Sequence, residues 1–372
     1  MKIGALVAGC SATLLGIGLQ RFAYAPLLPA MVQAGWLPAG EAGALGAANL
    51  GGYLLGAFGA GWVAHRAGLV PALRGAMLVA SACFALCALR GGLLWFLPWR
   101  VMAGAAGGVL VVLAGPAVQA AMAPAHRGVA AGIVFSGVGI GIVCGAVLVP
   151  LLLPAGLPQA WLALSAAGLA LTALSWRRWP TDGAPPRRVA GDARAHHPGS
   201  LRLLLAYALS AVTVTPQMLW WPDFIVRGLH RETHTAAVFW VAFGAAAACG
   251  PALCGRLGDG IGTARAFALV LVLQSVAVGL PLLSVSDAAL LASSVLCGAA
   301  SVGATALALT RTKEVAGIDG LRLWRTSTAA YGGAQSVAGF AMAWLYAATG
   351  SHLYLFWAGL AVSFVALFLG RK

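Results

Sequence analysis

Charged side chains are scarce in this sequence, and acidic ones most of all. Only 9% of the 372 residues are charged and nine are acidic, whereas 61% are hydrophobic and the mean hydropathy is +0.90. A water-soluble domain has about 25% charged residues, so this composition cannot cover a surface that faces water. The chain is therefore expected to be an integral membrane protein. Its net charge of +14 does not indicate nucleic-acid binding, because the basic residues are dispersed between apolar runs.

The sequence also lacks the side-chain patterns of a metal site, a catalytic set or a nucleotide-binding loop. None of its seven cysteines has zinc-ligand spacing, and all lie in or at the ends of apolar runs. The segment from His230 to His234 reads HRETH, which is not the H-E-x-x-H of a zinc helix. No Ser/His/Asp or Cys/His set and no ATPase motif can be argued. We therefore expect no metal, no cofactor and no enzymatic activity.

Twelve apolar runs have about the length needed to cross a membrane as helices, which is roughly 20 residues. They lack the alternation of barrel strands. The fold class that they predict is an all-α membrane protein with twelve transmembrane helices in two six-helix, pseudo-symmetric bundles. The runs are 4–34, 42–64, 70–89, 93–122, 129–150, 160–176, 201–226, 234–254, 264–285, 288–310, 326–348 and 353–369.

One long polar stretch, 177–202, interrupts these runs and is rich in Pro, Gly and Arg, as flexible linkers are. We expect an N-terminal bundle at 1–176, a cytoplasmic linker at 177–200 and a C-terminal bundle at 201–372. With the N-terminus inside, eighteen of the 23 basic residues fall on the cytoplasmic side and three outside. The positive-inside rule then places both termini in the cytoplasm. The first run continues well past the length of a signal peptide, which favours an uncleaved helix.

Two motifs recur in the halves at a constant offset of 194. Residues 61–68, GWVAHRAG, correspond to 255–262, GRLGDGIG, and residues 100–106, RVMAGAA, correspond to 294–300, SVLCGAA. Each pair lies at equivalent helices. We therefore expect duplicated halves related by an axis along the membrane normal.

At this point the chain resembles the major facilitator superfamily over essentially its whole length. Arg100 and Gly104 look like the arginine motif of that family's fourth helix. The opening GIGLQRFAYAPLLPAM, 16–31, resembles the uncharacterised bacterial YbfB/YjiJ-like branch. The resemblance implies that helices 1, 4, 7 and 10 line a central cavity. Helix 5 lacks the Gly-Pro of the drug/proton antiporter motif, which makes drug antiport less expected.

The same resemblance implies a cytoplasmic gate in the loops after helices 2 and 8. His65 and Arg66 occupy the first copy of the family's loop signature, and Arg256 and Asp259 occupy the second. His65 stands where the family usually has Asp, so the charge relay of the first copy is altered. We expect these four residues to belong to the gate network.

Arg21 and Arg100 lie within apolar runs, where an arginine costs roughly 2.5–3.5 kcal/mol. Pro26 and Pro29 follow Arg21 and favour a bend. Two guanidiniums that face one cavity would favour an anionic solute. The alternative is structural pairing, with backbone carbonyls or with Asp223. At an offset of 194 the equivalents are Thr215 and Ser294, and neither is basic.

Asp223 is the one acidic residue expected near membrane depth. It could be a proton-coupling carboxylate or a partner of Arg21, and the alternative is a solvated helix end. Further candidate substrate ligands are polar residues within the runs, which could instead form interhelical hydrogen bonds. They are Asn49, Tyr53, Gln217, Tyr331 and Gln335.

Together these features predict a secondary active transporter that moves a small, anionic organic solute across the inner membrane by alternating access. An efflux pump of the same fold, a membrane scaffold or receptor, and a polytopic membrane enzyme are the alternatives. The expected partners are the solute, a proton or other coupling ion, and the lipid bilayer. We expect a monomer.

Overall fold

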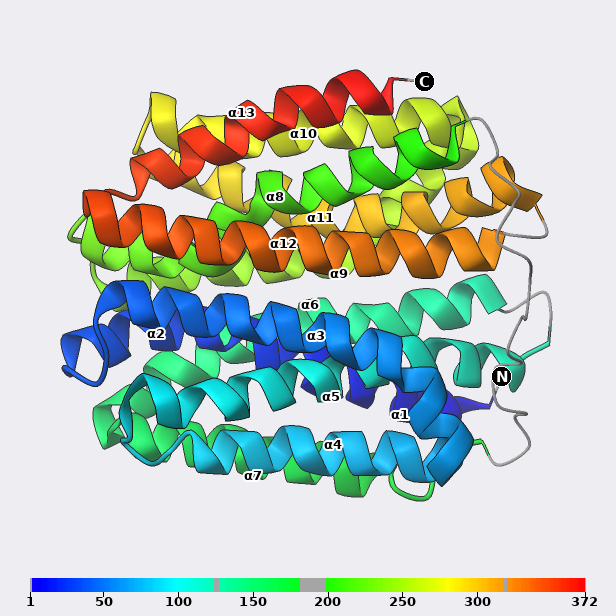
Figure 1. Ribbon diagram of the computed structural model, residues 1–372, viewed down its shortest axis with the longest axis horizontal. Coiled ribbons are helices and arrows are strands. Elements are labelled where there is room, and N and C mark those ends of the chain that lie inside the picture. The colour runs from blue at the N-terminus through cyan, green and yellow to red at the C-terminus, as the bar shows by residue number, and fades with distance from the viewer. Residues whose placement is uncertain (1, 124–126, 181–198, 318–319, 372) are drawn as a thin grey trace.

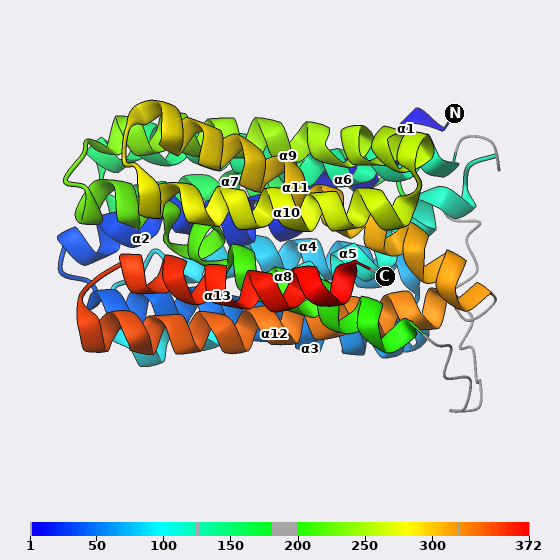
Figure 2. The same cartoon turned by 90° about the horizontal axis from the view of Figure 1, so that it is seen from above.

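The computed structural model describes residues 2–123, 127–180, 199–317 and 320–371, and in this part of the chain the regular elements are all helical. The helices run side by side along the long axis of the molecule in both views (Figures 1 and 2). They are α1 (Ile3–Thr13), η1 (Leu14–Phe22), α2 (Tyr24–Gln33), α3 (Ala39–Ala67), α4 (Leu69–Leu86), α5 (Gly92–Ala120), α6 (Arg127–Leu152), η3 (Leu153–Ala155), α7 (Leu157–Ser175), α8 (Ser200–Asp223), η4 (Phe224–Gly228), α9 (Thr233–Ile261), α10 (Thr263–Leu283), α11 (Asp287–Ala316), α12 (Gly320–Thr349) and α13 (Leu353–Gly370).

Each predicted apolar run corresponds to one helix or to one nearly continuous series of helical segments. Within the described residues, ten of these spans are both long and apolar enough to cross a membrane. The other two, α3 and α12, are long but less apolar, and they contact each other. In Figure 1 they lie side by side in the middle of the molecule, with α4 and α7 at one edge and α10 and α13 at the other. The least apolar helices are therefore central.

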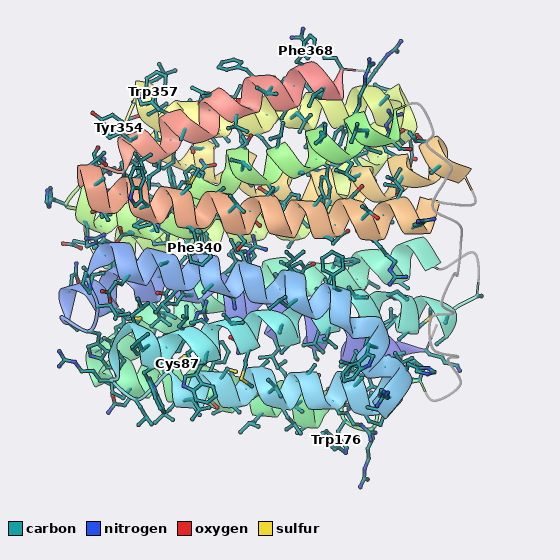
Figure 3. All side chains as sticks on the ribbon, viewed as in Figure 1. Cys87, Trp176, Phe340, Tyr354, Trp357 and Phe368 are labelled. Atoms are coloured by element: carbon teal, nitrogen blue, oxygen red, sulfur yellow. The ribbon has the colours of Figure 1, made fainter. Side chains whose placement is uncertain are left out.

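The outer surfaces of the edge helices carry large apolar side chains. Trp357 is 57% exposed and Phe368 is 76% exposed, and both project outward from α13 in Figure 3. Trp176, at the opposite edge, is 37% exposed. Soluble monomers rarely expose large contiguous apolar patches, whereas a lipid-facing surface requires them. This arrangement fits a protein embedded in a bilayer.

Both ends of the chain lie at the same end of the molecule, here named the terminal end (Figure 1). The end opposite, where α2 leads into α3 and η4 leads into α9, is named the distal end. The predicted linker, 177–200, starts and finishes at the terminal end, although its residues 181–198 lie outside the described residues. An even number of spans on each side of the linker gives this arrangement.

The first span contains a π-helical segment, η1, between two α-helices. Such segments are rare and occur often at functional sites. The change of register at Ala23 comes shortly before Pro26, which lies in the first turn of α2, where a backbone N–H would have no intrahelical partner. The proline therefore fits the new start of the helix. Arg21 lies in the last turn of η1.

Glycines bring pairs of helices into backbone contact, and the pairs repeat along the chain. A Cβ at Gly104 of α5 would overlap the carbonyl oxygen of Asn49 of α3. A Cβ at Gly298 of α11 would overlap the carbonyl oxygen of Phe243 of α9. Both members of the second pair follow those of the first at the same offset as the sequence motifs. The two close approaches therefore occupy equivalent positions.

The first span and α8 correspond at a slightly larger offset, the one that relates Ile3 to Ser200, where these helices begin. Two hydrogen bonds repeat at this larger offset. The Gln20 amide nitrogen donates to the Ala80 carbonyl, and the Gln217 amide nitrogen donates to the Ala277 carbonyl at 3.0 Å. The larger offset already holds at Ile3, before the π-helical segment, so this segment does not cause it. The chain has three more residues between Gln20 and Asn49 than between Gln217 and Phe243. An offset taken from the loop motifs therefore cannot be carried into the first span.

This shift changes the residue that is equivalent to Arg21. At the larger offset the equivalent is Met218 of α8, in place of Thr215. A further contact supports this correspondence, because the Arg100 guanidinium lies 4.2 Å from the centre of the Tyr24 ring. At the equivalent positions, Trp221 donates a hydrogen bond to Ser294 at 2.9 Å.

Candidate functional site

Arg21 reaches from η1 to helices of the second half of the chain. Its guanidinium donates to Oε1 of Gln335 on α12 and lies 3.7 Å from the sulfur of Met218 on α8. The side chain is half-buried, and its Nε has no hydrogen-bond partner among the described residues. Arg21 therefore contacts neutral groups and keeps one donor unused.

Tyrosines surround this arginine. Those close enough to interact electrostatically with it are Tyr53 on α3, Tyr207 on α8 and Tyr331 on α12. The rings of Tyr207 and Tyr331 lie 4.6 Å apart, and Tyr53 and Tyr331 are half-buried. The structure thus brings the predicted residues Arg21, Tyr53, Tyr331 and Gln335 together. Below, these four are called the central site.

Arg100 lies on α5, outside the central site, and is only 1% exposed. Its guanidinium donates to the backbone oxygen of Gln20 at 3.0 Å and covers the Tyr24 ring. The backbone oxygen of Arg100 in turn accepts from the amide of Asn49 at 3.1 Å. These contacts match the alternative in which the arginine pairs with a carbonyl. Arg100 holds the residue that precedes Arg21.

Two of the predicted ligands make contacts between neighbouring helices. Asn49 joins α3 to α5 and is 3% exposed. Gln217 joins α8 to the Ala277 carbonyl of α10 and the Ser293 hydroxyl of α11, and it is fully buried. Both side chains therefore make the interhelical hydrogen bonds that the sequence left open as the alternative.

Asp223 does not contact Arg21. It is fully buried near the distal end of α8, where its carboxylate binds Arg227 through both oxygens and His352 at 2.7 Å. Arg227 follows Asp223 by one helical turn, a spacing that favours ion pairs. His352 lies just before α13. The acid is thus neither the partner of Arg21 nor a solvated helix end.

The predicted gate residues lie at the terminal end and are all exposed: His65, Arg66, Arg256 and Asp259. Arg66 lies over the ring of Trp62, at 5.5 Å from its centre. Within the described ranges, no ion pair joins the two copies of the loop signature. In this conformation the described residues of the two copies therefore do not pair with each other.

The distal end, in contrast, is closed by an apolar cluster from α3, α8, α12 and α13. Here Trp220 is fully buried, and its ring fills the space where a Cβ at Gly43 would lie. A Cβ at Gly40 would lie 3.0 Å from that of Ala347. The cluster comprises Leu50, Leu219, Trp220, Met342, Ala343 and Leu355. Helices from both halves of the chain therefore meet tightly at this end.

Several contact residues were not identified by sequence reasoning. Met218 is recognisable only once the larger offset between the first span and α8 is known, and Arg227 could have been found from its spacing to Asp223. Tyr207 and His352 carry no sequence signal of their own. In the described part of the chain, no group of three His, Cys, Asp or Glu side chains could hold a metal ion.

Comparison with known proteins identifies the family. No curated protein matches the chain. A family model described as uncharacterised MFS-type transporter YbfB matches residues 13–371, which is nearly the full length. The match agrees with the long apolar helices and with the resemblance of the opening motif. The chain is a multi-pass membrane protein and belongs to the family of uncharacterised MFS-type transporters named after YbfB.

Proposed function

We propose that this transporter moves a small, anionic organic solute by alternating access and binds its carboxylate or phosphate group at Arg21. The observation that carries this proposal is the uncompensated charge of Arg21. Among the described residues, its guanidinium contacts an amide, a thioether and the ring of Phe22, and its Nε has no hydrogen-bond partner. Even a half-buried charge is costly when no counter-ion accompanies it. An anionic ligand would supply the missing charge.

Gln335 occupies the place that a ligand oxygen would take. Its Oε1 accepts from Arg21, while its Nε2 lies 3.0 Å from the Met218 sulfur. A carboxylate could replace this neutral acceptor and engage two guanidinium nitrogens at once, which gives a stronger and more specific contact. The tyrosine hydroxyls nearby could then donate to the remaining oxygens. Gln335 would return to Arg21 when the solute leaves.

The symmetry of the chain supports a central position for Arg21. Arg21 and its equivalent, Met218, touch each other. Two equivalent residues that touch must lie beside the axis that relates their halves. We propose that this axis separates two six-helix bundles, 1–176 and 201–372, with α3 and α12 facing each other across it. The solute would then bind between the bundles.

Two observations support an inward-facing conformation. The distal end is closed, and no ion pair joins the two copies of the loop signature within the described residues. In this proposal the terminal end is cytoplasmic, both termini lie in the cytoplasm, and the membrane is the bacterial inner membrane. His65, Arg66, Arg256 and Asp259 would pair across the bundles only in the outward-facing conformation. Transport would alternate the apolar seal at the distal end with this polar gate. The protein would work as a monomer.

Ligand-dependent thermal stabilisation tests the proposal, because a ligand that binds the folded state raises its stability with occupancy. Purified protein is screened with small carboxylates, phosphate esters and uncharged analogues. We expect anions to stabilise the wild type and Arg202→Gln, which removes an exposed arginine from α8. We expect no anion effect in Arg21→Gln. Equal stabilisation of Arg21→Gln by the same anions would contradict the proposal.

A further inference from the structure

The buried acid near the distal end belongs to a compact polar cluster, which is named the distal triad: Asp223, Arg227 and His352. Arg227 Nε lies 2.5 Å from Oδ1 of Asp223, and His352 Nε2 lies 2.7 Å from Oδ2. Asp223 is fully buried and His352 is 4% exposed. The carboxylate and the guanidinium balance each other in charge. A neutral imidazole therefore leaves the triad neutral, and a protonated one makes it a buried cation.

The distal triad supports the tryptophan that closes the distal end. The His352 ring lies 4.6 Å from the Tyr346 ring and 6.0 Å from the Trp220 ring. Trp220 and Tyr346 are themselves 4.8 Å apart. On its other side, Trp220 fills the space beside Gly43 of α3. Movement of His352 therefore acts on a side chain that spans the interface between α8 and α3.

We propose that His352 of the distal triad binds a proton from the outer solution and that this proton opens the distal seal. This inference rests on the proposed alternating-access function and assigns its coupling ion. The Nε2–H of His352 continues to donate to Asp223, and the added proton binds Nδ1. That atom faces Gly228, where a Cβ would lie only 2.9 Å away, so the glycine leaves the space next to Nδ1 open.

The electrostatic surroundings determine the direction of the effect. Arg227 and Tyr346 face the Asp223–His352 pair, and Tyr24 of α2 lies within electrostatic range of Asp223. Trp220 and Phe224 add only aromatic surface. Arg227 already balances the charge of the carboxylate, so a protonated His352 lacks a counter-charge. It is therefore disfavoured while the closed seal keeps water away. Opening the seal admits water, so protonation favours the outward-facing conformation.

The experiment measures the separation of the two bundles at the distal end as pH is varied. Spin labels are attached to cysteines introduced at Gln33 of α2 and Ala288 of α11, both exposed. Cys249→Ser removes the exposed native thiol, and protein without the introduced cysteines gives the labelling blank. Electron–electron distance distributions are recorded in lipid nanodiscs from about pH 8 to pH 5, the range in which histidine titrates. No transported solute is required.

The variants separate His352 from other titrating groups. His352→Gln keeps an amide donor for Asp223 but cannot gain a charge, and His234→Gln removes an exposed histidine of α9 as the control. In the wild type and the control we expect the long-distance population to grow as pH falls. If the open conformation binds the proton ten times more tightly than the closed one, full protonation raises the ratio of open to closed protein tenfold. In His352→Gln we expect the ratio to be constant.

The remaining outcomes are also decisive. A pH response in His352→Gln equal to that of the wild type, or a wild type without a response, overturns the inference. Folding is checked by size exclusion and by the neutral-pH distances, which should match the wild type. If His352→Gln fails this check, Asp223→Asn replaces it, and an unchanged pH response in that variant overturns the inference instead. Anion binding at Arg21 is measured separately, so failure of the proposed function is distinguishable.

Discussion

Replacing Arg21 by methionine tests the central site with little change of side-chain length. The substitution puts at this position the residue that α8 carries at the equivalent position, Met218. It removes the charged hydrogen bond to Gln335, which is worth about 1.5–3 kcal/mol. It also removes an arginine from membrane depth, which costs roughly 2.5–3.5 kcal/mol on insertion scales. These two effects nearly cancel. We therefore expect Arg21→Met to fold with a melting temperature close to that of the wild type.

Binding should respond very differently from stability. A carboxylate that accepts two charged hydrogen bonds from Arg21 gains about 3–6 kcal/mol, taking roughly 1.5–3 kcal/mol for each. Loss of both hydrogen bonds raises the dissociation constant by about 10²–10⁴-fold, because 1.4 kcal/mol corresponds to a factor of ten. The assay is isothermal titration of the most stabilising anion into wild type, Arg21→Met and Arg202→Gln in detergent. Arg202→Gln should bind as the wild type does.

Two results would refute the reasoning. If Arg21→Met bound the anion within threefold of the wild type, Arg21 would not be the ligand. If the variant lost most of its thermal stability and could not be purified, the arginine would be a structural group whose pairing with Gln335 holds the bundles together. Arg21→Lys distinguishes intermediate cases, since a lysine keeps the charge but loses the bidentate geometry. It should bind more weakly than the wild type and better than methionine.

Three further substitutions, with Gly59→Ala as a control for the second, test helix packing and the proposed gate. Arg100→Leu leaves the Gln20 carbonyl without its donor and should lower apo-protein stability by about 1–3 kcal/mol in denaturant titrations. Gly104→Val would overlap the backbone of α3 and should abolish monodisperse protein in size exclusion, whereas Gly59→Ala, which meets open space, should be neutral or stabilising. Asp259→Asn removes the acid of the proposed gate and should enrich the short distances between the distal labels.

The fold was largely predictable because the thickness of the membrane sets the length of each apolar run. Every span needs about 20 apolar residues, so the runs locate every helix, although α9 and α11 extend six or seven residues beyond their runs and α12 begins six residues earlier. The repeat at the loop offset identified Gly104 and Gly298 as equivalent, but only the structure shows which helices they contact. The π-helical segment was not predictable, because no composition distinguishes it from an α-helix. The larger offset between the first span and α8 has another cause, because three additional residues separate Gln20 from the loop motif at the end of α3.

The site was predictable only in part, and the difference lies in how each side chain finds its partner. Arg21, Tyr53, Tyr331 and Gln335 meet across helices that are adjacent in the middle of the molecule, as their polarity suggested. Arg100 and Gln217 carry the same sequence signal, yet they bond to neighbouring helices, and Arg100 Nε and Gln217 Oε1 have no partner among the described residues. Polarity in an apolar run shows that a partner exists, but the rotation of the helix decides which one. His352 was not identified from the sequence because it lies between helices. Only within an apolar run does a polar residue stand out.

The asymmetry between Arg21 and Met218 gives a physical reason for a proposed binding site with one arginine. If both bundles carried arginine at this position, two cations would touch at low dielectric, and their repulsion would favour separation of the bundles in the empty protein. Arginine in one bundle and methionine in the other let the empty site close around a neutral glutamine. In the proposed mechanism an anion would then neutralise the charge of Arg21, and the two bundles could rock about a site that is neutral when occupied. An empty site that keeps its charge resists desolvation, so the solute itself would lower the barrier between the two conformations.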